Sequence, residues 1–355
     1  MLRRFRIALS IAAVAALSQA TWAQQVVEEG KGNALPVAAP RIPGGVHLPD
    51  FALSAIPAVS GAMLREMRVE PAADAAPDLL SELQYNLERI ELDPVQDYSA
   101  DLFLDQASDV KWDVAGAFAI TTAVGLSAWG WEISDFRFKS EGWFGKDTKY
   151  LGMDKLGHAY TGYILSDYFT QRIAHEAAGR DGAAMTGALL GMGVQTYVEV
   201  LDGFSGGHGF SYEDLIMDGV GAGFSYLRST IPALAETVDF RMEYLPSGYG
   251  DGFAPVTDYS GQKYLLALKL SGFEEFQETP LRFVELQVGY YARGISDEER
   301  ARGDTLRREP YVAVGFNLGE LLHAADAGDS LPGLAAMRAT EYLQVPYAYV
   351  PTSRN

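Results

Sequence analysis

The feature that most constrains the fold is a pair of long segments in which charged side chains are almost absent. Residues 114–131 contain no charged residue, and Glu199 is the one charged residue in 182–201. A helix that is apolar on all sides is buried, either in protein or in lipid. Small residues at intervals of three or four allow close helix contact in both settings. Both segments are therefore predicted to be buried helices.

Two further helices complete a predicted helical region. One covers residues 153–176, and the other covers 211–229, beginning with Ser211 as its N-cap and ending before Pro232. We favour a compact four-helix core that lies at or partly in a membrane surface, because strongly apolar spans tend to be retained in the inner membrane during export. A membrane-spanning bundle is the alternative. Four aromatic residues fit an interfacial belt and the core equally well: Trp129, Trp131, Trp143 and Phe144.

From about residue 258 the apolar residues recur with a period of two, which is typical of β-strands. Such alternation covers three segments, at residues 263–270, 283–290 and 311–318. A last strand is predicted at 342–350, at a sheet edge because Pro346 cannot donate to a central ladder. The acidic stretch 297–308 is predicted to be a solvated hairpin loop. The fold class is α+β, a glycine-rich apolar four-helix core followed by a small antiparallel sheet.

The N-terminus predicts export from the cytoplasm. Residues 1–23 combine early arginines, a short apolar stretch and small residues before Gln24, as a secretory signal peptide does. An uncleaved anchor is the alternative. A Pro/Ala-rich extended leader is predicted at 24–75, a helix at 78–92, a helical domain at 76–240 and a strand domain at 241–355. The predicted location is the periplasm of a Gram-negative bacterium, in association with the outer membrane after removal of the signal peptide.

Composition excludes several classes of function. The formal net charge is −19, from 28 Lys and Arg against 47 Asp and Glu, whereas nucleic-acid binding requires a basic surface. The sequence contains no cysteine, which excludes disulfides, thiol catalysis, cysteine-bound metals and a lipid-modified cysteine. A hydrophobic content of 48% predicts a folded core.

Ionisable residues gather in the predicted helical region. Asp154 and His158 share one helix face, and Glu199 and Asp202 lie one turn apart at the end of the charge-poor helix. Ser211, Asp214 and Asp218 follow on the next helix, after a glycine-rich loop that contains His208. Because a charge on a buried helix is costly unless it is paired or used, these residues are expected to share one centre.

Two interpretations of this centre remain open. Asp154, His158, Glu199, Asp202 and Asp214 have the residue types that hold metals between helices, and a divalent ion would relieve the repulsion of the carboxylates. Its bound water would attack an ester or amide, with His208 or Glu199 as general base and Ser211 within the same site. The alternative is a structural or ligand-orienting network. In it Lys155 pairs with an acid, His158 bonds Glu199, and Ser211 and Asp214 cap a helix.

Four blocks in order carry a family resemblance: residues 141–147, 154–158, 199–204 and 209–214, followed by Gly219 and Gly221. Over residues 110–230 they resemble the YfiM-type family of predicted periplasmic or outer-membrane-associated proteins, which has no assigned function. More remotely, the pattern is similar to the VanZ-like membrane family. This chain departs from VanZ-like proteins in having Asp218 where they usually have Asn, and His208-Gly209-Phe210 where an Arg precedes the Ser.

Three functions are consistent with these observations. The first is a membrane-associated cell-envelope protein of unassigned role, with the polar centre as a structural or ligand-orienting network. The second is a membrane-surface hydrolase of a lipid or envelope polymer, assisted by a divalent metal. The third is an assembly scaffold whose leader docks onto another envelope protein. The expected partners are membrane lipid or an envelope protein, and the sequence leaves the oligomeric state open.

Overall fold

The structure is a computed structural model, and it describes residues 89–90, 92–145, 148–176, 181–248 and 253–352. The predicted signal peptide, the leader and most of the predicted helix at 78–92 lie outside these residues. Arg89, Ile90 and Leu92, which end that predicted helix, are not helical. The described residues all belong to one compact unit.

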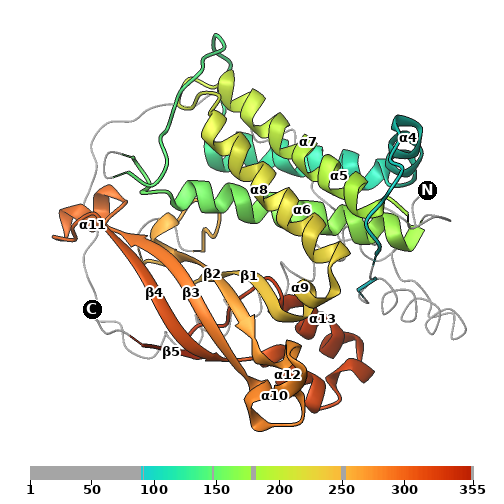
Figure 1. The fold of residues 1–355 in the computed structure, drawn as a ribbon. Helices are drawn as coiled ribbons and strands as arrows, with labels where there is room; N and C mark the ends of the chain where they lie inside the picture. Colours follow the sequence, from blue (N-terminus) through green and yellow to red (C-terminus); the bar gives the residue numbers. More distant parts are fainter. Residues whose placement is uncertain (1–88, 91, 146–147, 177–180, 249–252, 353–355) are drawn as a thin grey trace, which may run out of the picture. The chain divides into compact units, whose positions relative to one another are not determined.

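The helices and strands follow the predicted α+β order (Figure 1). The longer helices are α4 Ala100–Asp109, α5 Lys111–Val124 with a π-helical turn over Gly125–Trp129, α6 Met153–Glu176, α7 Ala183–Gly203, α8 Tyr212–Thr230 and α13 Leu331–Thr340. The shorter ones are α9 Pro232–Thr237, α10 Glu274–Gln277, α11 Asp297–Ala301 and α12 Leu318–Ala324. The strands are β1 Val238–Tyr244, β2 Gln262–Lys269, β3 Val284–Arg293, β4 Arg307–Phe316 and β5 Tyr349–Pro351.

Helix α6 is the centre of the helical layer, because it packs closely on both α7 and α8. Glycines make this approach possible. A Cβ atom on Gly221 of α8 would lie 1.9 Å from the Ala159 carbonyl oxygen, and one on Gly191 of α7 would lie 2.2 Å from Ser166 Oγ. Contacts this short exclude any side chain. The small residues of α7 and α8 therefore serve helix contact within the protein.

The helical layer meets the sheet through aromatic rings. Tyr160 and Tyr163 of α6 pack on Phe240 of β1 and Tyr264 of β2, and all four side chains are buried. The sheet is antiparallel with the order β1-β2-β3-β4-β5. The chain after α13 reaches both sides of the sheet. Leu343 forms a β-bridge with Met242 of edge strand β1, and β5 pairs with β4 to form the other edge.

The strand predictions needed several corrections. Strand β1 was not predicted from the sequence. The strand predicted at 311–318 ends at Phe316 because Asn317 caps α12, and only the end of the strand predicted at 342–350 is extended. The expected solvated loop at 297–308 contains α11, which a Ser296–Glu299 capping box begins, and Glu299 is buried.

The apolar segments differ from the prediction in their burial. None of the residues of α5 is buried, although the helix carries no charge after Asp113. Within the described part of the chain, no helix reaches both the length and the hydropathy required to cross a bilayer.

Candidate functional site

A cluster of ionisable side chains lies where the first turns of α6 and α8 meet the end of α7. We call it the His158 cluster, and its members are Glu141, Asp154, Lys155, His158, Glu199, Asp214 and Asp218. His158 Nδ1 donates to Asp218 Oδ1 at 3.0 Å and lies 3.7 Å from Glu199 Oε1. Its Nε2 lies 3.7 Å from Asp214 Oδ1. The His158 side chain is 21% exposed, whereas these three carboxylates are buried.

Lys155 is the second cation of the cluster and is fully buried. Its Nζ lies 2.7 Å from Asp214 Oδ1, 2.8 Å from Asp154 Oδ2 and 3.4 Å from Glu141 Oε2. The ammonium group thus neutralises carboxylates that come from α6, α8 and the α5–α6 connection. Pairing of this kind is what makes the burial of these charges tolerable.

The pKa values follow from burial and from the crowding of carboxylates. Burial alone would lower the pKa of His158, but Asp218, Asp214 and Glu199 outweigh it and raise the pKa to about 10. Burial raises the pKa of Glu199 to about 8, against the attraction of His158. At neutral pH His158 is therefore an imidazolium, and Glu199 is mostly a neutral acid. Neither group is in the form that a general base requires.

Ser211 serves the structure of α8. Its backbone N–H donates to Glu199 Oε2 at 3.1 Å, and its Oγ accepts the Asp214 N–H at 3.2 Å as the N-cap. The same hydroxyl donates to Glu213 Oε2 at 3.1 Å. Among the described residues no hydrogen bond joins Ser211 to His158. The hydroxyl is thus used as a cap, the role that the structural interpretation gave it.

Asp202 and His208 lie close to each other, and neither is a member of the His158 cluster. Asp202 Oδ1 accepts Trp131 Nε1–H at 2.5 Å and lies 3.8 Å from His208 Nδ1. His208 Nε2 is 2.9 Å from the Trp129 carbonyl oxygen. Burial raises the pKa of Asp202. This pair holds the chain that follows α5.

Three predicted ligands do come together. One ligand atom each from His158, Glu199 and Asp214 lie within 4.8 Å of one another, and so do atoms of Glu141, Asp154 and Asp214. Asp202 and His208 belong to neither group. The two groups share Asp214, whose Oδ1 already contacts Lys155.

Two members of this region were not among the predicted site residues. Gln195 Nε2 donates to Asp218 Oδ1 at 2.7 Å, and Glu141 reaches Lys155 from a segment without helical period. The signal for Gln195 was its place one turn before Glu199 in an otherwise apolar helix. Glu141 had no local signal beyond its place in the first family-like block.

The connection between α5 and α6 is fixed to the α7–α8 loop by polar contacts. Arg137 donates to the carbonyl oxygens of Ser205 at 3.0 Å and His208 at 3.2 Å, and to that of Gly206. The Glu213 carboxylate accepts the Gly142 N–H at 3.2 Å and the Ser140 hydroxyl. Figure 1 shows this connection running past the ends of α7 and α8.

Apolar side chains of this connection and of the adjoining ends of α7 and α8 are exposed to solvent. We call them the apolar platform, which consists of Ile133, Phe136, Phe138, Trp143, Phe204 and Tyr212. Ile133 is fully exposed and Phe138 is 79% exposed, while the others range from 38% to 52%. The Phe136 ring lies 5.1 Å from that of Phe138 and 5.0 Å from that of Phe204. Of the aromatic residues with two predicted environments, Trp143 is exposed and Phe144 packs on Tyr290.

Comparison with known proteins gives one family. Residues 140–230 match the model of a family described as predicted periplasmic lipoprotein (DUF2279), and this segment includes every member of the His158 cluster. No curated protein and no solved structure matches the chain. The sequence contains no cysteine to carry the lipid of a lipoprotein. The YfiM-type name and the VanZ-like similarity are not confirmed. The match supports an uncharacterised periplasmic family and a location in the periplasm or envelope.

Proposed function

We propose that the protein is an envelope protein that rests on a lipid surface through the apolar platform and the adjoining outer face of α8. In this proposal the His158 cluster is the structural network that holds the platform in place. The periplasmic family match supports the compartment.

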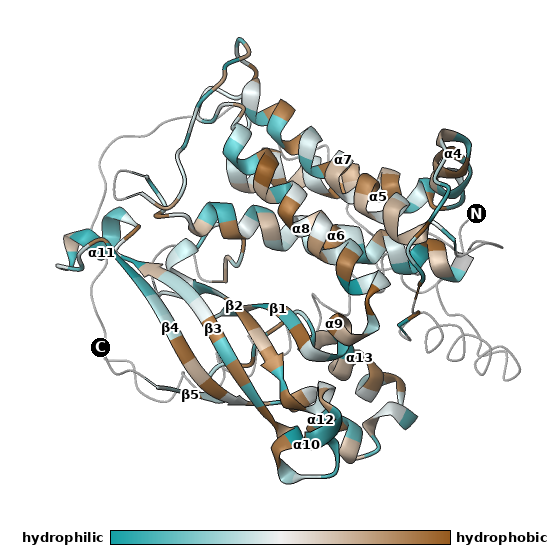
Figure 2. Cartoon of the chain, in the orientation of Figure 1, coloured by the Kyte–Doolittle hydropathy of each residue, from teal (hydrophilic) through white to brown (hydrophobic). Residues whose placement is uncertain are grey.

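The observation that carries the proposal is the inverted polarity of α8, whose hydropathy is coloured along the helix in Figure 2. Its buried face is polar, with Glu213, Asp214, Asp218, Ser225 and Arg228. The exposed face is apolar, with Tyr212, Ile216, Val220 and Leu227 each 45% to 53% exposed. A helix at a protein–water surface has the opposite arrangement. An apolar face that the protein does not bury marks an interaction or membrane site.

Helix α5, which precedes the platform in the chain, and the platform itself have surfaces that suit lipid rather than a charged partner. Helix α5 exposes Trp112 and Ile120, and the π-helical turn after it exposes Leu126. No charged residue occurs from 114 to 131, in a chain whose net charge is −19. Aromatic rings favour the boundary between lipid and water, where one edge is apolar and the other is wet.

The cluster links the buried network to this surface. Lys155 binds Glu141, and Glu213 binds Ser140 and Gly142. These contacts fix the residues that directly precede Trp143 in the chain. Polar contacts fix the backbone of the platform together with the ring contacts of Phe136 and Phe138. The exposed parts of its apolar side chains, above all Ile133, remain available for insertion between lipid headgroups.

Vesicle flotation tests the proposal. The chain purified from the periplasm is mixed with neutral phosphatidylcholine vesicles, and the fraction that floats is compared with that of Phe138→Ser. We expect the native chain to float and the variant to float much less. Because the Phe138 ring also contacts Phe136 and Phe210, the melting temperature of the variant is measured beside the flotation to show that it is folded. Flotation at high salt should persist because the face is uncharged. Failure of the native chain to bind would overturn the proposal.

A second candidate, a metal-assisted hydrolase of a lipid or envelope polymer, is favoured by one specific observation. Among the residues that the structure describes, none forms a hydrogen bond with Glu199 Oε1, although Glu199 is 1% exposed and lies beside His158 and Asp214. A divalent ion would complete such a set, but it would compete with Lys155 for Asp214 Oδ1. Metal analysis tests this candidate: Lys155→Met should raise the bound Zn²⁺ or Mn²⁺, and Glu199→Gln should abolish it. Absence of metal in both the native protein and Lys155→Met would exclude this candidate.

A further inference from the structure

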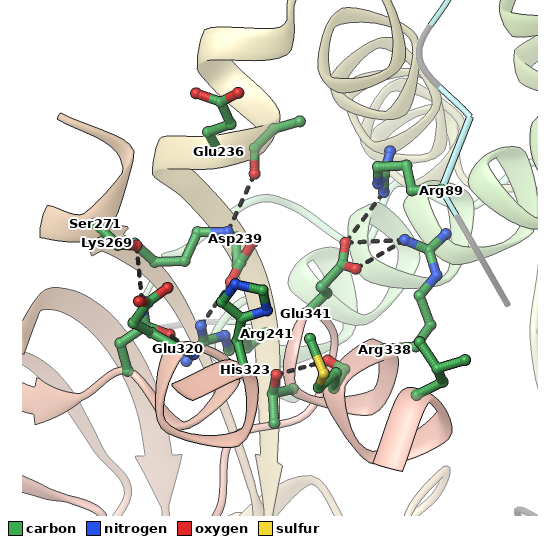
Figure 3. A pocket seen from close by; sticks show the side chains of 16 residues that line it. Arg89, Glu236, Asp239, Arg241, Lys269, Ser271, Glu320, His323, Arg338 and Glu341 are labelled. Atoms are coloured by element: carbon green, nitrogen blue, oxygen red, sulfur yellow. Dashed lines mark hydrogen bonds and ion pairs between the residues drawn. The ribbon is translucent and has the colours of Figure 1, made fainter. Parts of the chain in front are cut away.

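The sheet has one polar face that is buried and one apolar face that is largely open. On the buried face, Asp239 of β1 forms ion pairs with Arg241 at 2.6 Å and with Lys269 of β2 at 2.9 Å. Arg241 in turn pairs with Glu285 of β3. Figure 3 shows Arg241 and Lys269 close to Asp239, in the pocket at this end of the buried face. Because successive residues of a strand point to opposite faces, the apolar residues between these polar ones point away from the network.

The strand register gathers six exposed apolar side chains on the open face. Leu266 of β2 lies opposite Val288 of β3, which lies opposite Val312 of β4. Directly opposite residues share a face, and so do residues two positions apart in one strand. We call this group the sheet patch. Its members, each 42% to 62% exposed, are Leu266, Leu286, Val288, Val312, Val314 and Phe316.

The helical layer covers the open face only on the side of β1. Phe240 lies opposite Leu266, and Tyr264 is two residues before it, so both belong to the same face as the sheet patch. Both rings pack against Tyr160 of α6. Figure 1 shows β3 and β4 extending away from the helical layer. The described part of the chain therefore leaves the sheet patch uncovered.

The size of the sheet patch matches the central part of an interface between proteins. From their exposed fractions, its six side chains offer on the order of 500 Å² of apolar surface, an area that marks an interaction site. A standard interface buries about 800 Å² on each partner, and about 65% of this area is apolar in homodimers. The patch thus supplies roughly the apolar area that one subunit of a dimer buries.

The composition of the sheet patch favours a second copy of the chain over lipid. Phe316 is its one aromatic residue and the others are Leu and Val, whereas five of the six residues of the apolar platform are aromatic. The Trp and Tyr side chains that anchor proteins at lipid headgroups are missing from the patch. Aliphatic rows on two equal sheets can instead interdigitate. For a chain of net charge −19, an uncharged face is also where two copies repel each other least.

Charges of opposite sign lie at the two ends of the sheet patch. Helix α10, which follows β2 at the end where Phe316 lies, carries three exposed acids: Glu274, Glu275 and Glu278. At the other end, Arg308 of β4 is exposed on the same face as Val312. Among the described residues, none of these four charges forms an ion pair. A two-fold axis that reverses the strand direction between copies brings each α10 towards the Arg308 end of the other copy.

We propose that the sheet patch is the interface of a two-fold dimer of this chain, in which the sheets of the two copies pack face to face with opposite strand directions. Val288 and Val312 occupy the centre of this interface, and Arg308 of each copy faces α10 of the other. The dimer uses no residue of the apolar platform or of α8, so it goes beyond the proposed lipid binding.

Sedimentation equilibrium of the full chain purified from the periplasm, in the absence of lipid, tests the proposal. We expect the native chain to have the mass of a dimer. Val288→Lys should raise the dimer dissociation constant by at least about 100-fold, because it places two like charges in an apolar interface. Val220→Lys is the matched control, since Val220 is 53% exposed on α8, and it should remain a dimer.

Arg308→Glu keeps the test decisive if Val288→Lys has a lowered melting temperature, because Arg308 is exposed. Reversing this charge should weaken the dimer severalfold, and the effect should shrink at high salt. A native chain that is monomeric at every concentration overturns the proposal, and so does an unchanged dimer in Val288→Lys or in Arg308→Glu. Equal weakening by Val220→Lys would also overturn it.

Vesicle flotation of the same variants separates this proposal from lipid binding. Val220→Lys should lose flotation and stay dimeric, whereas Val288→Lys should become monomeric and still float. Loss of flotation in Val288→Lys with an unchanged mass would identify lipid as the occupant of the sheet patch and overturn the dimer. A native chain that is dimeric but does not float would refute the proposed lipid binding alone.

Discussion

Ile133→Ala gives the most direct quantitative test of the apolar platform. The Ile133 side chain is fully exposed, so its removal has no packing cost in the folded protein. The substitution deletes three carbon atoms, and each buried methylene contributes about 0.8 kcal/mol, so full insertion into lipid predicts a loss of about 2.4 kcal/mol. That loss corresponds to a roughly 50-fold weaker partition coefficient. The free energy of unfolding in the absence of vesicles should not change.

The assay is partitioning of the periplasmic chain onto phosphatidylcholine vesicles, measured over a series of lipid concentrations. Val350→Ala is a matched control, because Val350 is an aliphatic residue that is 69% exposed on β5, outside the platform. We expect the control to partition as the native chain does. Equal partitioning of Ile133→Ala and the native chain would refute the placement of the platform in lipid, and an equal loss in both variants would refute its specificity.

Three predictions concern the buried networks. Because His158 and Glu199 have pKa values raised from 6.5 to about 10 and from 4.5 to about 8, folding takes up protons. Their stabilisation is complete below about pH 4.5 and is lost as pH rises through 8 and then 10. Urea unfolding should therefore show a lower midpoint at pH 9 than at pH 6, and Glu199→Gln should reduce that difference; a higher midpoint at pH 9 would be inconsistent. Gly221→Ala places a Cβ 1.9 Å from a carbonyl oxygen and should destabilise by about 3 kcal/mol or more, whereas Gly223→Ala, which meets open space, should be tolerated. Similar unfolding midpoints for both would exclude the close helix approach. Arg228→Met leaves Asp239 and Glu341 with one cation fewer in a buried network and should cost about 3 to 5 kcal/mol by denaturant unfolding. A loss below about 1 kcal/mol would show that the network does not depend on Arg228.

The helices were predictable because their signals are local. The predicted helix at 153–176 coincides with α6, and the Ser211 N-cap and Pro232 mark the ends of α8 as expected. Helical spacing alone indicated that Asp154 and His158 share one face of α6. The sequence also placed Glu199 near the end of α7. The period of two likewise located β2, β3 and most of β4.

The polar interior was not predictable in the same way, because its partners are distant in sequence. Strand β1 alternates apolar and charged residues, but Asp239, Arg241 and Glu243 are buried rather than solvated. Their burial depends on partners such as Glu285, which no local pattern connects to them. The same holds for Arg89, whose partner Glu341 belongs to the last part of the chain.

Part of the sheet shares the inverted polarity of α8. Strand β3 buries Glu285 and Gln287 but exposes Leu286 and Val288, so its polar side chains also face inward. In both layers the buried groups are satisfied largely by one another, through ion pairs that join helices or strands.

This arrangement separates two tasks that one apolar core usually performs. Ion pairs and glycine contacts hold α6 to α7 and α8, as the short Gly221–Ala159 approach and the buried Lys155 show. The apolar faces that point outward are therefore not required to hold the helices together. Substitutions at these faces should change what the protein binds before they change whether it folds, which is the reverse of the usual consequence of removing large apolar side chains.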